Sequence, residues 1–126
     1  MKHNKFMEIV DNILLTAIVR KASLLRVVHN PVENRLQIWE KIGNEPLQVQ
    51  DTMNGLLTAS IITRLKIIGG LSITDHHSVQ QGIYEFNFGT AFSVGSKKIG
   101  IICIPTISNG GYGEEIVVIL DSPKNN

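Results

Sequence analysis

Residues 51–70 read DTMNGLLTASIITRLKIIGG, and this stretch has the clearest helix pattern in the chain. Asp51 or Thr52 offers the side-chain oxygen that caps the free N–H groups at a helix start. Residues at helical spacing then form one stripe: Met53, Leu56, Leu57, Ser60, Ile61, Arg64, Leu65 and Ile68. Gly69-Gly70 follows, and glycine accepts the left-handed conformation that ends many helices. We therefore expect a helix that follows a cap at Asp51 or Thr52 and ends before Gly69.

An earlier helix is predicted over residues 4–21, where apolar residues also recur at helical spacing. They are Phe6, Ile9, Val10, Ile13, Leu14, Ala17 and Ile18. Between the two helices the period changes to that of strands. We expect a hairpin of strands 24–29 and 35–42, with Leu36, Ile38, Glu40 and Ile42 on one face, and a short third strand over 47–50.

Residues 72–82 are polar and irregular, and four strand patterns follow them at 83–88, 90–94, 98–104 and 116–120. Tyr84, Phe86 and Phe88 alternate onto one face, and both faces of residues 99–104 look buried because both are apolar. Helix, strands, helix and strands in this order predict an α+β fold, a mostly antiparallel sheet with two main helices.

The chain has 126 residues and a mass of 13.9 kDa, which predicts a single domain over 1–126. We expect a folded core over 1–121 and a frayed tail over 122–126. A hydrophobic fraction of 43% predicts a true core, and a net charge of +1 argues against nucleic-acid binding. The longest apolar run, residues 56–70, is interrupted by charged and hydroxyl side chains, so we expect no membrane insertion and a cytoplasmic location.

Few residues suggest chemistry, and we predict no catalytic residue, cofactor or metal. Cys103 is the only cysteine and lies in the apolar stretch GIICIPT, which indicates a buried structural thiol. The glycine-rich loop at 108–113 lacks the lysine of a phosphate-binding loop, and a predicted strand follows it in place of a helix opened by a hydroxyl residue. Glu114 and Glu115 are adjacent, so in a strand they point to opposite faces.

The candidate interaction surface consists of polar and aromatic residues: Trp39, Lys41, Asp75, His76, His77 and Glu114. Asp75, His76 and His77 offer three possible metal ligands in a row, but neighbouring residues rarely point at one ion, so a surface loop is the better interpretation. Trp39 and the aromatic group of Tyr84, Phe86 and Phe88 are suited to core or interface packing, or to stacking on a flat ligand.

The order of segments resembles the N-terminal subdomain of the ATPase module in type II secretion and type IV pilus assembly ATPases. In that family an amphipathic helix leads to a motif like ASDIHIE, and here residues 22–28 read ASLLRVV. A helix ending like SRIKVMAGLDI corresponds to TRLKIIGGLSI at 63–73, and a PQDGR motif to VQQGI at 79–83. A strand like DVRVSTLPT and a GE-containing turn correspond to IICIPTIS at 101–108 and GEEIVVIL at 113–120. The resemblance covers nearly the whole chain and implies a PAS-like sandwich.

Departures from the family motifs bear on function. In the family, arginines of this subdomain reach nucleotide phosphates held by the ATPase core. Their positions fall here on Trp39, Ile83 and Cys103, with Lys41 the nearest positive charge to Trp39. Leu24 and Gln81 stand where the family has aspartates, and no Walker A pattern occurs in the chain.

The resemblance therefore implies a non-catalytic protein-interaction or regulatory module. Its expected partner is a secretion or pilus assembly ATPase, or another copy of the chain in a homo-oligomer paired through strand edges near 90–94. The alternative is a PAS-like sensor of a small ligand, with Tyr84, Phe86 and Phe88 lining the site.

Overall fold

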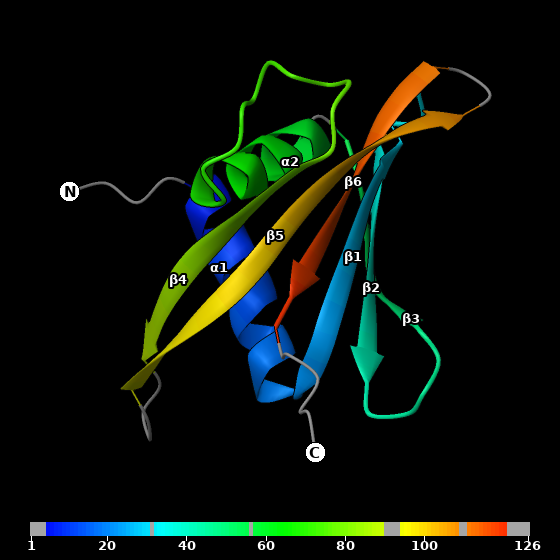
Figure 1. Cartoon of the computed structure of the whole chain (residues 1–126). Helices are drawn as coiled ribbons and strands as arrows, with labels where there is room; N and C mark the ends of the chain where they lie inside the picture. The colour runs from blue at the N-terminus through cyan, green and yellow to red at the C-terminus, as the bar shows by residue number, and fades with distance from the viewer. Residues whose placement is uncertain (1–4, 31, 56, 90–93, 109–110, 121–126) are drawn as a thin grey trace.

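The computed structural model describes residues 5–30, 32–55, 57–89, 94–108 and 111–120. Within these residues the chain forms two helices and six strands in the order α1 (Lys5–Val19), β1 (Ala22–Asn30), β2 (Arg35–Ile42), β3 (Gln48–Asn54), α2 (Leu57–Ile68), β4 (Gln80–Gly89), β5 (Val94–Ser108) and β6 (Gly111–Ile119). Figure 1 shows both helices on the same side of one sheet. The α+β fold with a mostly antiparallel sheet is confirmed.

The sheet has the strand order β3-β2-β1-β6-β5-β4, and every neighbouring pair is antiparallel. Strands β1 and β6 occupy the centre, whereas β3 and β4 form the edges. Because β3 and β4 lie at opposite edges, the chain between them crosses the sheet, and α2 with the loop 71–79 makes that crossing. On the way α2 contacts α1 and strands β1, β3, β5 and β6.

The core lies between the helices and the sheet face that they cover. Side chains of a strand alternate between faces, so every second residue of the central strands enters this core. The buried apolar side chains of the sheet are Ala22, Leu25, Val27, Leu36, Ile38, Phe86, Ile99, Ile101, Cys103, Ile116 and Val118. Leu36, Ile38 and Glu40 share this face as the alternation predicted, and Tyr84 and Phe88 pack against it from β4.

The predicted start of the second helix is wrong. Asp51 and Thr52 cap no helix, because residues 51–54 belong to β3, where Met53 pairs with Leu36 and Asn54 with Arg35. The chain turns only at Gly55, whose φ of +107° is a conformation that glycine adopts without steric strain. Helix α2 begins at Leu57. Pairing with β2 gives the backbone groups on the inner side of this edge strand hydrogen-bond partners, and this outweighs the local helix pattern.

Other boundaries differ by a few residues. The first helix ends at Val19, and Lys21 takes a φ of +61° where the prediction kept it helical. The second helix ends as predicted, with Gly70 at a φ of +70°. Residues 80–82 belong to β4 rather than to the irregular loop. A strand and a dimer edge were predicted at 90–94, but residues 90–93 lie outside the described residues. The predicted frayed tail at 122–126 lies outside them as well.

The expectation that both faces of residues 99–104 are buried is wrong as well. Ile99, Ile101 and Cys103 are buried, but Gly100, Ile102 and Ile104 are only half-buried. Both helices lie on the other side of the sheet, so no described element covers this face. We call it the open face.

Candidate functional site

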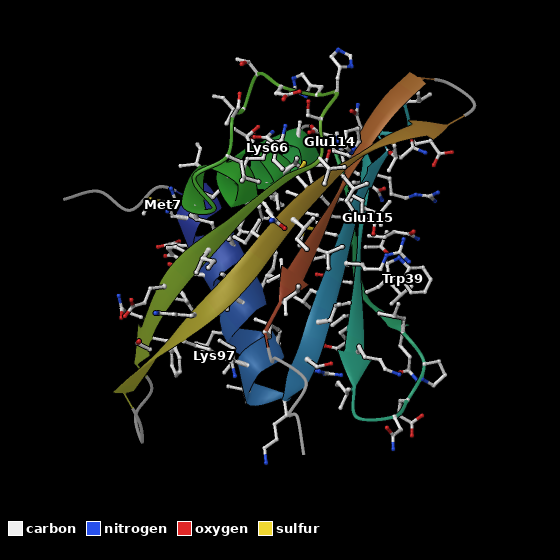
Figure 2. The ribbon with its side chains drawn as sticks, viewed as in Figure 1. Met7, Trp39, Lys66, Lys97, Glu114 and Glu115 are labelled. Carbon is white, nitrogen blue, oxygen red and sulfur yellow. The ribbon has the colours of Figure 1, made fainter. Side chains whose placement is uncertain are left out.

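A buried ion pair joins the second helix to the sheet. The Lys66 side chain of α2 is 1% exposed, and its Nζ contacts the Oε2 of Glu114, a residue of β6 that is 13% exposed. Figure 2 shows the two residues beside each other where α2 lies against the sheet. A lysine at this depth requires a partner, because an unpaired charge away from water is strongly unfavourable.

The loop 71–79 closes over this ion pair. Lys66 Nζ also donates to the carbonyl oxygen of Asp75 at 3.3 Å, and His76 Nδ1 lies 3.2 Å from Glu114 Oε1. The Asp75 carboxylate accepts the N–H groups of His77 and Ser78 at 2.9 and 3.1 Å. These backbone donors hold the pKa of Asp75 below its usual value. The loop is therefore attached to both partners of the pair.

The charges at this site are mutually compensated. Burial opposes ionisation of Glu114, but hydrogen bonds from Lys66 and Cys103 outweigh it, so the pKa of Glu114 lies below its usual value. The Cys103 Sγ lies 3.4 Å from Glu114 Oε2, and burial together with that carboxylate raises the pKa of the thiol to about 12. Cys103 thus stays protonated and donates to Glu114, and the interpretation as a buried thiol is confirmed.

A cavity of about 320 Å³ lies next to the pair, lined among others by His29, Ile62, Lys66, His76 and Glu114. His29 Nε2 lies 3.1 Å from Thr58 Oγ1, and burial lowers the pKa of His29, which favours the neutral ring. The sequence prediction missed both Lys66 and His29. Lys66 stands one position after Leu65 of the predicted stripe, and a charged residue beside an apolar stripe was the only available signal.

The structure brings together only part of the predicted interaction surface. Asp75, His76 and Glu114 meet at the ion pair, and His77 lies in the same loop. Trp39 and Lys41 belong to β2. Figure 2 shows Trp39 away from Lys66 and Glu114. Lys41 Nζ donates to the carbonyl oxygen of Glu45, and Trp39 pairs in register with Arg26.

The open face is the second candidate surface. Register places apolar residues next to one another across four strands: Leu24, Ile83, Ile102, Val117 and Ile119, with Gly100 among them. Arg26 and Glu115 form a two-pronged ion pair on this face, with both N–O distances 2.7 Å. A hollow of about 500 Å³ is lined by Ile83, Gly100, Ile102 and Ile119, among others. Glu114 and Glu115 thus point to opposite faces, as predicted.

The fold and these surfaces define a class of small α+β domain, in which two helices cover one face of an antiparallel sheet. No protein-family model matches the chain, and no curated protein matches it in sequence. Among solved structures, it is similar to the X-ray structure of the Legionella pneumophila ATPase DotB, with a TM-score of 0.60 and 12% sequence identity. The match covers 90% of this chain and 29% of that chain, so this chain spans less than a third of DotB. A likeness at this identity shows a shared fold.

Metal binding and membrane insertion can also be judged from the described residues. Within the described ranges, no group of three or more His, Cys, Asp or Glu side chains is placed to hold a metal ion. In the same ranges, neither helix has the length and apolar character that a membrane span requires.

Proposed function

We propose that this chain is a non-catalytic protein-interaction module that binds through its open face. The observation that carries the proposal is Ile83, a large apolar side chain that is 73% exposed at the rim of an apolar hollow. Contiguous exposed apolar surface of this kind is typical of sites where proteins bind one another. The Arg26–Glu115 pair on the same face supplies the polar surroundings that such sites usually have.

The chemistry of the ion-pair site supports a non-catalytic role. Cys103 is protonated and buried, so it is a poor nucleophile. Glu114 is neutralised by Lys66 and accepts hydrogen bonds on both oxygens, which leaves it ill-suited to act as a base. We infer that these groups hold the loop 71–79 against the sheet.

The fold similarity to DotB supports a relationship with secretion ATPases. We propose a regulatory module related to the N-terminal subdomain of such ATPases. The side chains at the positions of the family's phosphate-contacting arginines are Trp39, Ile83 and Cys103, none of which compensates phosphate charge. The proposed partner class is a secretion or pilus assembly ATPase.

A small-ligand sensor is the second candidate, and the 320 Å³ cavity beside Lys66 and His29 favours it. The aromatic group is not part of that cavity, since Phe86 is buried in the core and Tyr84 and Phe88 pack against it. A native mass spectrum of the purified protein tests this candidate, because a bound molecule adds a defined mass that disappears on denaturation.

Capture of a purified pilus or secretion ATPase by the immobilised chain tests the interaction proposal. Ile83→Asp places a charge in the apolar face and should lower the captured amount about tenfold or more. Ile67→Asp is the matched control, because Ile67 is 50% exposed but lies on α2. Equal capture by both variants would contradict binding through the open face.

A further inference from the structure

The most exposed part of the open face combines a protruding side chain with a hollow. Ile83 on β4 is 73% exposed, and its cross-strand partner on β5 is Gly100, which has no side chain. Ile102 and Ile119 form the other walls of the hollow above Gly100. A protrusion and a recess therefore lie on adjacent strands at the same level of the sheet.

We propose that a second copy of this chain packs on the open face, with its own open face turned toward the first. The two-fold axis would lie between the two sheets and run along the strands, above the line between β4 and β5. This axis puts each residue of β4 over its own cross-strand partner on β5 of the second copy. Each Ile83 then enters the hollow at Gly100 of the other copy, as a self-complementary two-fold contact requires.

The charges next to this contact are complementary under the same axis. Glu85 pairs in register with Lys98, and both residues are exposed. Residues two positions apart on a strand point to the same face, so Glu85 shares the open face with Ile83, and Lys98 shares it with Gly100. The axis places Glu85 of each copy over Lys98 of the other. Side chains of this length meet between sheets that pack about 10 Å apart.

An arrangement of two copies about an axis across the strands does not match in this way. A two-fold axis across the strands at the level of Ile83 would set Ile83 against Ile83 and Gly100 against Gly100. Two protrusions would then collide while two hollows stayed empty. The second-copy inference rests on the proposed function, since both use the open face as a contact surface. It identifies one partner of this face as a second copy of the same chain.

A mixing experiment tests the geometry. Sedimentation velocity over a concentration series should show the 13.9 kDa chain associating into a dimer. The dimer has two symmetry-related contacts between position 85 of one copy and position 98 of the other. Glu85→Lys or Lys98→Glu makes both contacts like-charged, so each variant alone should weaken dimerisation about tenfold or more. An equimolar mixture of the two variants restores both opposite-charge contacts between copies, so it should form a heterodimer. Association that is unchanged in the single variants, or absent from the mixture, would overturn the proposed axis.

Two further variants probe the protrusion and the hollow without charge. A Cβ on Gly100 would meet Ile119 Cβ at 3.5 Å, an ordinary contact, so Gly100→Ala should leave the monomer intact while it puts a methyl group into the floor of the hollow. Gly100→Ala and Ile83→Ala should both weaken the dimer, whereas Ile67→Ala on α2 should not. Circular dichroism of each variant checks that the fold is retained.

The outcomes separate this inference from the proposed function. A chain that stays monomeric at every concentration, yet captures an ATPase in an Ile83-dependent way, overturns the second copy alone. A dimer that follows the predicted pattern, with no Ile83-dependent capture, supports the second copy and contradicts the proposed ATPase partner.

Discussion

The Nζ of Lys66 contacts the Oε2 of Glu114, and this contact attaches helix α2 to strand β6 beneath the loop 71–79. The same carboxylate accepts hydrogen bonds from His76 and Cys103. Glu114 is therefore the common acceptor for a helix, a loop and strand β5. We expect the order of this end of the molecule to depend on that one charge.

Lys66→Met should destabilise the protein by about 3 kcal/mol or more, because it leaves the Glu114 carboxylate buried without its cation. Urea unfolding measures the change. The double variant with Glu114→Gln removes the unpaired charge, so it should be more stable than Lys66→Met alone. Equal stability of the single and double variants would contradict a coupled pair.

Stability should fall as the pH drops below the ordinary glutamate pKa of 4.5. The folded state holds the pKa of Glu114 below that value, so the unfolded chain binds the proton more readily. The stabilisation is fully present above pH 4.5 and is lost as the pH falls through the folded pKa. Urea midpoints measured from pH 7 to pH 3 should show a smaller acid loss in Glu114→Gln than in the natural sequence.

Gly82→Ala should lower the free energy of unfolding by about 1–3 kcal/mol, because the added Cβ would lie 1.9 Å from the carbonyl oxygen of Gly69. Strand β4 passes the end of α2 at this point, so backbone must move to admit a methyl group. Gly100→Ala is the matched control on β5, where the methyl group has room. Thermal unfolding should rank Gly82→Ala well below Gly100→Ala, and the reverse order would contradict the close approach.

Arg20→Ala should cost about 1–3 kcal/mol, because it removes the partner of Glu40, a residue 4% exposed. Arg20 Nη2 lies 2.6 Å from Glu40 Oε1, and no described group hydrogen-bonds to Glu40 Oε2. Glu40→Met replaces the buried charge with an apolar side chain of similar size, so it should be neutral or stabilising. A marked loss of stability in Glu40→Met would show that the ion pair itself is favourable.

Much of the fold followed from local patterns in the sequence. The alternation at residues 35–42 predicted both the bounds of β2 and its buried face, and Gly69-Gly70 predicted the end of α2. Glu114 and Glu115 were expected on opposite faces from adjacency alone. These features depend on the two-residue period of strands and the conformational freedom of glycine, which neighbouring residues decide.

Only the tertiary structure decided which patterns prevailed and which residues met. Residues 51–54 entered β3 because β2 offered backbone partners that a helix pattern cannot reveal. Lys66, Cys103 and Glu114 meet because α2, β5 and β6 pack together, although Lys66 and Glu114 lie 48 positions apart along the chain. The apolar open face is likewise a consequence of both helices packing on one side of the sheet. Contacts between distant segments depend on the global arrangement, and the local pattern of a sequence carries no direct signal for them.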